Sequence, residues 1–235
     1  MLAYSKTDGV LEIVPNAVDV QEIEKKHSHI DKYFDAIIKD NEKLKKAGKN
    51  VDEFFMAPPE QVKDKLQENL MYSLAGYCVV TYLLGIGDRH LENVMITNLG
   101  KFLHIDFGFA MGEDPNIKPP PFKLTSDMIA GFGGLKSENF KIFSSKCIAY
   151  YLKLREHSNL ILNLLYMMID CDLVVNPNKG IKLGQVHIDE VVNKLQLGAS
   201  DMQAERWFKA VLENSFKSFK AWRGGLQDTF HKAAV

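Results

Sequence analysis

The chain has 235 residues, enough to bury a substantial core in one domain or two small ones. Its apolar fraction of 46% and charged fraction of 25% are ordinary for a soluble globular protein. Because 29 basic residues stand against 30 acidic ones, the global charge gives no sign of a nucleic-acid partner, and we expect none.

Residues 1–14 are predicted to form two short strands with a turn at Asp8–Gly9. The opening residues lack the apolar run and the small-residue cleavage site of a signal peptide. Residues 16–57 follow as a charge-rich stretch of helical character. His27 and His29 within it could bind a metal ion, but no third ligand stands nearby, so we expect a solvated surface.

A long core helix is predicted from Pro58 to Leu84. Proline favours the first turn of a helix, and Glu60 complements the positive end of its dipole. Side chains suited to a core recur at helical spacing, at Val62, Leu66, Leu70, Leu74, Tyr77 and Thr81. Glycines follow at positions 85 and 87, where the backbone can turn sharply. The helix therefore delivers the next segment at its C-terminal end.

That next segment carries Asp88, then Asn93 five residues later, then Asp106 at the head of Asp-Phe-Gly. Two short strands, 94–97 and 101–105, are predicted between them, joined by the turn Asn-Leu-Gly. The hairpin brings Asn93 and Asp106 beside each other. A carboxylate and an amide oxygen on facing segments suit Mg²⁺, which prefers hard oxygen ligands and also bridges nucleotide phosphates. Protein kinases use the same trio to hold the attacking hydroxyl and two magnesium ions.

The triplet Asp-Arg-His at 88–90, with His-Ile-Asp-Phe-Gly at 104–108, resembles the phosphatidylinositol 3-/4-kinase superfamily and departs from the His-Arg-Asp of protein kinases. Within the superfamily, residues 75–93, 119–124 and 158–164 look most like class III phosphatidylinositol 3-kinases. The resemblance implies a mainly α, kinase-like α+β fold. It would be a kinase C-lobe with a small catalytic β-hairpin and a short remnant of the N-lobe.

In this resemblance, residues 1–14 correspond to the N-lobe remnant and hinge, and residues 15–235 to the helical C-lobe. The catalytic loop would span 85–93 and the activation loop 106–124. The phosphate-covering loop and strand lysine of a complete kinase are not among these residues, so we expect a fragment or a truncated product. A non-catalytic scaffold is the alternative from another functional class.

The resemblance also assigns roles to the loop residues. Asp88 or His90 would accept the proton of the attacking hydroxyl, and both remain candidates. Arg89, between them in the catalytic triplet, would brace the loop rather than touch substrate. Asn93 and Asp106 would hold the metal ions. The implied cofactors are ATP and Mg²⁺, with Mn²⁺ as an alternative ion.

Adenine would lie between backbone and apolar groups in the same resemblance. The Glu12 carbonyl and the Val14 amide would pair with the base at the hinge, whereas a plain edge hairpin is the competing interpretation. Met95 and Ile105 would form the apolar floor beneath the base.

Several other side chains are expected in the core. His104 would be a core histidine satisfied by hydrogen bonds, and Phe107 would pack. Cys78, Cys147 and Cys171 lie far apart in apolar contexts, which predicts free core thiols rather than disulfides or a zinc site. A reducing cytosolic setting fits this cysteine usage.

The stretch from 109 to 123 contains several prolines and is predicted to be an exposed loop rather than a helix or a central strand. Its position directly after a metal ligand favours contact with the phosphate acceptor. Lys118 and Lys123 are offset by Glu113 and Asp114. The loop therefore suits the single phosphodiester of unphosphorylated phosphatidylinositol better than a bisphosphate headgroup, which would need more basic groups.

Helices are predicted for most of the remainder, at 125–129, 137–157, 158–170, 187–195 and 200–223, with a loop at 176–180. Leu160–Ile169 is too short to span a bilayer and is expected to be a buried helix. The amphipathic helix 200–223 mixes aromatic residues such as Trp207 and Phe208 with basic ones. Such a stripe is usually core packing, but the resemblance favours peripheral membrane contact.

Together these features predict a phosphatidylinositol 3-kinase C-lobe that transfers the ATP γ-phosphoryl group to the 3-hydroxyl of phosphatidylinositol. The resemblance implies endosomal and autophagic membrane trafficking, a cytoplasmic protein peripheral on those membranes, and a regulatory protein-kinase-like subunit. A phosphatidylinositol 4-kinase and a related Ser/Thr kinase stay open as alternatives. The motif Pro-Pro-Pro-Phe-Lys-Leu counts against the Ser/Thr kinase.

Overall fold

The computed structural model describes residues 2–5, 8–117 and 119–221, without the side chains of residues 3 and 216–221. The α-helices are α1 (Val20–His27), α2 (Ile30–Lys46), α3 (Pro59–Leu84), α4 (Ser126–Ala130), α5 (Glu138–Glu156), α6 (Ser158–Met168), α7 (Gln185–Leu195) and α8 (Asp201–Ala221). The strands are β1 (Leu2–Ala3), β2 (Gly9–Val10), β3 (Ala17–Asp19), β4 (Val94–Thr97), β5 (Phe102–His104), β6 (Val174–Asn176) and β7 (Ile181–Lys182). Short 3₁₀ turns are η1 (Glu53–Met56), η2 (Leu91–Asn93) and η3 (Ile169–Cys171). The mainly helical fold with small sheets confirms the predicted fold class.

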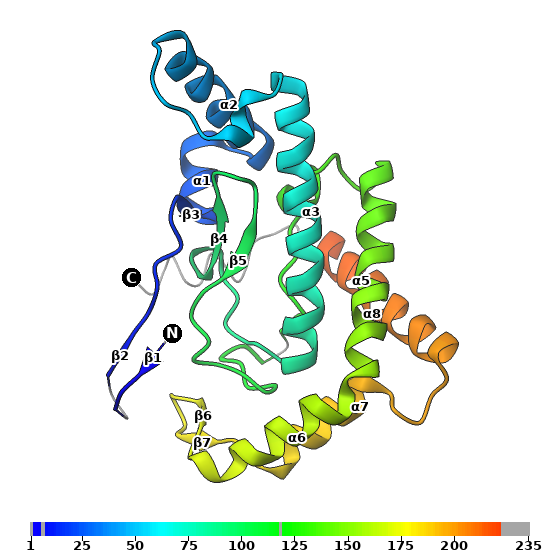
Figure 1. Ribbon diagram of the computed structural model, residues 1–235. Coiled ribbons are helices and arrows are strands. Elements are labelled where there is room, and N and C mark those ends of the chain that lie inside the picture. The colour runs from blue at the N-terminus through cyan, green and yellow to red at the C-terminus, as the bar shows by residue number, and fades with distance from the viewer. Residues whose placement is uncertain (1, 6–7, 118, 222–235) are drawn as a thin grey trace.

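Helix α3 runs through the middle of the molecule, with the β4–β5 hairpin on one side and α5 on the other (Figure 1). Pro59 stands in its first turn, where a missing N–H costs nothing. Gly85 ends it in the left-handed conformation, and the Ile86 N–H donates to the Thr81 carbonyl at 3.0 Å. This glycine cap turns the chain sharply into the catalytic loop.

The predicted catalytic hairpin is present as β4 and β5, and it extends to a three-stranded antiparallel sheet through β3. The third strand lies in a stretch expected to be helical, so that part of the expectation is wrong. The hairpin is fixed to α3 by two hydrogen bonds. The Phe102 N–H donates to Ser73 Oγ at 2.8 Å, and Asn69 Nδ2 donates to the Leu99 carbonyl at 2.7 Å.

The apolar side chains form two cores that meet at the end of α3. The larger core packs α3 against α2, the sheet and α5, with Phe34, Leu70 and Phe143 fully buried. The smaller core joins the last turn of α3 to α6, β6 and α7, and includes Val175 and Ile188. The catalytic loop leaves α3 where the two cores adjoin.

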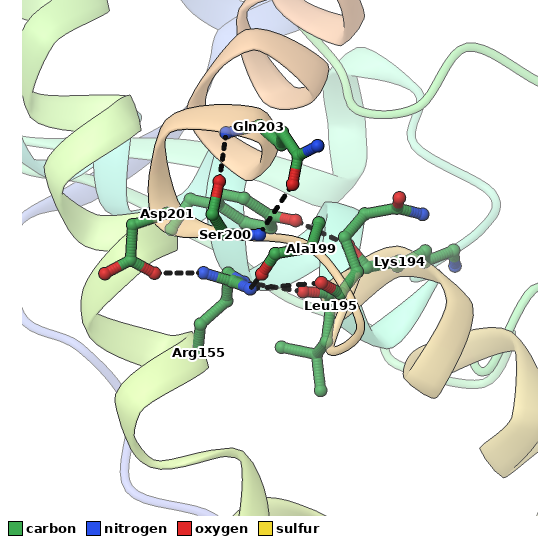
Figure 2. Close-up of polar contacts among 9 residues, drawn as sticks. Arg155, Lys194, Leu195, Ala199, Ser200, Asp201 and Gln203 are labelled. Carbon is green, nitrogen blue, oxygen red and sulfur yellow. Dashed lines mark hydrogen bonds and ion pairs between the residues drawn. The ribbon is translucent and has the colours of Figure 1, made fainter.

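Arg155 on α5 fixes the connection between α7 and α8 (Figure 2). Its guanidinium donates to the carbonyls of Leu195 at 2.8 Å and Ala199 at 2.7 Å and also pairs with Asp201. Ser200 and Gln203 exchange hydrogen bonds, Ser200 N–H to Gln203 Oε1 at 2.9 Å and the Gln203 N–H to Ser200 Oγ. This reciprocal capping box begins α8 where the sequence predicted a helix start.

One face of α8 packs into the larger core. Ala204, Phe208 and Leu212 are buried, and the Phe208 ring stacks on Tyr151 with centroids 4.4 Å apart. Trp207 is 46% exposed and donates from Nε1 to Tyr82 Oη at 3.1 Å. The other aromatic residues of the predicted amphipathic helix, Phe216, Phe219 and Trp222, lie outside the described side chains. Phe208 is therefore core, and the membrane role of this helix stays a prediction.

Three further expectations are corrected. The apolar stretch in α6 is not a buried helix, because Leu160 is 60% and Met167 65% exposed. The stretch around 176–180 is the turn of a small β6–β7 hairpin rather than only a loop. Of the three free cysteines, Cys78 and Cys147 are buried as expected, but Cys171 is exposed. In each case, packing against other elements, rather than the local sequence pattern, decides the burial or the secondary structure.

Helices able to cross a bilayer are absent from the described part of the chain. The same residues hold no cluster of three or more histidine, cysteine, aspartate and glutamate side chains suited to a metal ion. His29 is mostly exposed and its Nδ1 lies 3.0 Å from Asp127 Oδ1, which agrees with the surface expected for the His27–His29 pair.

Candidate active site

The catalytic loop begins with two backbone segments that run side by side. The Gly87 N–H donates to the Phe109 carbonyl at 3.0 Å, the Met111 N–H to the Leu84 carbonyl at 2.7 Å, and the Gly112 N–H to the Gly85 carbonyl at 2.9 Å. A Cβ atom at position 85 would overlap the Gly112 backbone. Only glycine therefore permits this close approach between the catalytic and activation loops.

Arg89 braces the loop, as expected, and does not face open space. It is 5% exposed, and its Nε donates to the Gly87 carbonyl at 2.6 Å. Its Nη1 donates to the Ile105 carbonyl at 2.7 Å, and its Nη2 donates to the Asp106 carbonyl. Burial lowers the pKa of the guanidinium, and the nearby aspartates oppose this shift. One side chain thus ties the catalytic loop to the Asp-Phe-Gly segment.

Asn93 and Asp106 are brought together by the hairpin. The Ile105 N–H donates to the Asn93 carbonyl at 3.0 Å, and Asn93 Nδ2 donates to the Asp88 carbonyl at 2.9 Å. Because Nδ2 is committed to Asp88, the Asn93 side-chain oxygen is the atom left for a cation. Asp106 is exposed, and its Oδ1 accepts the Gly108 N–H at 3.1 Å. An amide and a carboxylate oxygen form a donor set that fits Mg²⁺.

Both candidate aspartates have left-handed backbones. The φ angle is 53° at Asp88 and 57° at Asp106, a region that non-glycine residues enter rarely and that clusters at functional sites. His90 stands beside them, with its side chain 13% exposed and Nδ1 3.8 Å from Glu92 Oε2. The geometry leaves both Asp88 and His90 as candidates for the base.

Two neighbours of the site differ from expectation. His104 is buried, but its Nδ1 has no hydrogen-bond partner in the described part of the chain, so the expected satisfaction by hydrogen bonds is wrong. Its ring instead stacks on Tyr77 at a centroid distance of 4.8 Å. Burial, with the charge of Arg89, lowers the pKa of His104 to about 3. Phe107 is 53% exposed rather than packed, and the Arg89 guanidinium lies 5.7 Å from its ring centroid.

The proposed adenine-binding residues lie on two parts of the chain. Met95, half-buried, is in the middle strand opposite Asp19 and Leu103, and Ile105 is 36% exposed just after β5. Glu12 and Val14 are exposed in the segment after the β1–β2 pair. Two short strands pair at the start of the chain as predicted, but the turn does not include Gly9, which belongs to β2 and pairs with Ala3. The adenine roles stay predictions.

The structure describes only one of the two substrate-loop lysines, Lys123. The stretch 109–117 and 119–123 contains no helix or strand, as predicted. Lys118 lies outside the described residues. Lys123 is only 8% exposed, which differs from the exposed position expected for it, because neighbouring Phe122 and Leu124 are buried and carry the chain inward.

Sequence reasoning missed two contacts of the activation loop. Asp114 Oδ2 accepts the Asp88 N–H at 2.9 Å, and Glu113 Oε2 accepts Asn176 Nδ2 at 2.7 Å. Asp-Pro-Asn at 114–116 is a turn signature, and Asp114 Oδ1 does accept the Asn116 N–H at 2.7 Å. That local signal could have placed the turn, but not its distant partner Asp88.

The helical C-lobe, the hairpin and the Asp88, Asn93 and Asp106 arrangement define a kinase-like domain of the lipid-kinase type. The chain belongs to the family described as "Phosphatidylinositol 3- and 4-kinase", whose sequence model matches residues 1–178.

The chain is also similar to individual proteins of this family, which are named as phosphatidylinositol 3-kinases. "Phosphatidylinositol 3-kinase VPS34" of Candida albicans is 41% identical over 157 residues, which make up 66% of this chain and 15% of the relative. "Phosphatidylinositol 3-kinase catalytic subunit type 3" of Caenorhabditis elegans is 39% identical over 163 residues, 68% of this chain and 17% of the relative. "Phosphatidylinositol 3-kinase pik3" of Schizosaccharomyces pombe is 34% identical over 215 residues, 92% of this chain and 25% of the relative. The match thus covers a quarter or less of each of these relatives.

Proposed function

We propose that this chain supplies the catalytic C-lobe of a phosphatidylinositol 3-kinase of class III type. The reaction is transfer of the ATP γ-phosphoryl group to the 3-hydroxyl of phosphatidylinositol. One observation carries the proposal: Asp88, Asn93 and Asp106 belong to one hydrogen-bonded unit, braced by the buried Arg89. The names of the relatives support a 3-kinase within the family.

In this proposal the chain's residues divide the work of phosphoryl transfer. Asn93 and Asp106 hold Mg²⁺, or Mn²⁺ in its place, and the ion supplies charge neutralisation for the ATP phosphates. Asp88 or His90 orients the inositol hydroxyl and takes its proton. Met95 and Ile105 cover one face of adenine, and the backbone of Glu12 and Val14 pairs with its edge.

The preferred acceptor is phosphatidylinositol without further phosphates. Glu113 and Asp114 of the activation loop accept hydrogen bonds from Asn176 and from the Asp88 amide; these donors are neutral, so both carboxylates still offset the basic groups of the loop. The basic groups of the loop are Lys118 and Lys123, and Lys123 is largely covered. Such a loop offers little to a bisphosphate headgroup, which needs several charge-assisted hydrogen bonds.

The wider setting follows from the same proposal. The outer side of α8, with Trp207 exposed, is the proposed peripheral membrane contact. The protein would act on endosomal and autophagosomal membranes from the cytoplasmic side, with a regulatory protein-kinase-like subunit.

The proposal is tested with the purified gene product that contains this chain, offered phosphatidylinositol or its 4,5-bisphosphate in matched vesicles with ATP and Mg²⁺. We expect phosphatidylinositol 3-phosphate as the main product. The Asp106→Asn variant should lose roughly 100-fold or more in turnover, because it removes a charged metal ligand at the reacting phosphate.

Asp35→Asn is the matched control, because Asp35 is an exposed aspartate whose partner is Lys63 on the surface. It should leave turnover unchanged, and both variants should melt at the temperature of the parent. A 4-phosphate product would indicate a phosphatidylinositol 4-kinase. Preference for the bisphosphate would refute the acceptor assignment, and near-normal turnover of Asp106→Asn would refute the site.

A further inference from the structure

The activation loop holds the catalytic loop through a side chain as well as through backbone pairing. Asp114 is half-buried, and its two oxygens serve two segments. Oδ2 accepts the backbone N–H of Asp88 at 2.9 Å, and Oδ1 accepts both the N–H and the Nδ2 of Asn116 at 2.7 Å. The carboxylate is therefore shared between the candidate base and the turn of the activation loop.

The residue that Asp114 holds, Asp88, has a strained backbone. Asp88 has a φ angle of 53°, and a residue with a Cβ atom leaves this region unless its surroundings fix it. Its carbonyl is held by Asn93 Nδ2 at 2.9 Å, so the Asp114 carboxylate fixes the other side of the same residue. A hydrogen bond to an ionised acceptor is stronger than a neutral one.

The neighbouring residue, Glu113, fixes this part of the activation loop. Glu113 Oε2 accepts Asn176 Nδ2 from β6, and Glu113 Oε1 lies 3.8 Å from His187 Nε2 on α7. The Ala110 N–H donates to the Val175 carbonyl at 3.1 Å. The activation loop is thus anchored to the smaller core on one side while Asp114 reaches the catalytic loop on the other.

We infer that Asp114 is a positioning residue that holds Asp88 in its catalytic orientation and makes that orientation depend on the folded activation loop. The inference rests on the proposed kinase function for its catalytic consequence. The contact itself is independent of any function. An activation loop displaced from β6 would carry Asp114 away and release the Asp88 backbone.

The test compares Asp114→Ala, Asp88→Ala and the double variant in the gene product that contains this chain. We expect Asp114→Ala to lower kcat roughly 10- to 100-fold, the value of a lost hydrogen bond to a charged group. The KM for ATP should stay unchanged, because the backbone carbonyls of Asn93 and Asp106 are held by the Ile105 N–H and by Arg89, independently of Asp114. The double variant should be no slower than Asp88→Ala alone, as expected for residues that act as one unit.

A second measurement does not need activity. In the 235-residue chain, the Asp88 amide hydrogen should exchange slowly, and Asp114→Ala should speed its exchange at least tenfold relative to the neighbouring Leu91 amide. Asp114 lines a cavity of about 320 Å³, so solvent can reach the Asp88 N–H once the carboxylate is gone. Asp40→Ala, which removes an exposed aspartate paired with Lys43, is the control and should change neither rate.

The outcomes distinguish the positioning role of Asp114 from the catalytic role of Asp88. Normal kcat for Asp114→Ala, additive losses in the double variant, or unchanged exchange of the Asp88 amide each overturn the positioning role. Near-normal activity of Asp88→Ala shows that Asp88 is not the base and overturns the catalytic part of the inference, whereas the proposed function fails only if the protein forms no phosphatidylinositol 3-phosphate. The exchange result still decides whether Asp114 holds Asp88. If Asp88→Ala has no measurable activity, the kcat–KM split and the exchange rate decide.

Discussion

At the scale of single residues, the site combines strained backbone with dense hydrogen bonding. Left-handed backbone costs a non-glycine residue about 1 kcal/mol or more, yet Asp88 and Asp106 both adopt it. The groups that offset this cost differ: Asp114 and Asn93 hold Asp88, whereas Arg89 and the Gly108 N–H hold Asp106. Each aspartate is thus held by one group close to it in the sequence and by one group from another segment of the chain.

His104 supplies a pH prediction at the same scale. Its folded pKa of about 3 lies below its ordinary value of 6.5, chiefly because of burial. Between pH 6.5 and pH 3, His104 binds a proton in the unfolded chain but not in the folded chain. Stability is therefore intact above pH 6.5 and falls as the pH drops from 6.5 towards 3, by about 2 kcal/mol at pH 5 relative to pH 7.

Replacing His104 by phenylalanine should remove this dependence and keep a ring beside Tyr77, which now stacks at 4.8 Å. Denaturant unfolding of both proteins at pH 7 and pH 5 measures the difference. An equal loss of stability in the parent and in His104→Phe would show that other groups, not His104, cause the acid sensitivity.

At the scale of elements, the spacing of apolar residues and the residues typical of helix and strand ends predicted the elements that depend on local sequence. Helix α3 and the β4–β5 hairpin follow from proline, glycine and periodic apolar side chains. Strand β3 has only three residues and follows no alternation of its own, so it exists because β4 offers an edge. Strand β6 is likewise held by Ala110 and the core beneath Val175. The sequence of an apolar helix such as α6 does not predict which of its faces will be buried against neighbouring elements.

Two glycines of the same helical segment give a prediction for α3. Gly76 lies inside the helix with open space where a Cβ would stand, whereas Gly85 has a φ angle of 54° and faces the Gly112 backbone. Gly76→Ala should stabilise the protein by roughly 0.5–1 kcal/mol, because alanine is the better helix former. Gly85→Ala should destabilise it by about 2 kcal/mol or more, from left-handed strain plus displacement of the activation loop.

Denaturant unfolding of the two variants measures this contrast under one set of conditions. Similar stabilities for Gly76→Ala and Gly85→Ala would mean that the loop pairing at Gly85 does not constrain the end of α3.

At the scale of the whole molecule, the candidate active site lies between two cores of unequal size. The larger core holds the hairpin with Asn93, and the smaller core anchors the activation loop through Val175 and Asn176. Cooperative units with fewer buried contacts open at lower free energy. The spacing in the sequence predicted two candidate metal ligands, but the division of the candidate site between two cores depends on packing that no motif records.

The last prediction concerns the independence of these cores. Ile188 on α7 is fully buried in the smaller core, and Ile188→Ala should cost about 2–5 kcal/mol there. We expect faster amide exchange at residues 110–114 and 174–176, because the activation loop loses its anchor, while residues 143–151 of α5 keep their protection. Phe143→Ala, in the larger core, is the matched control and should instead speed exchange throughout α5. Equal acceleration of all these segments in Ile188→Ala would show one cooperative unit, and the activation loop could then not be released separately from the catalytic hairpin.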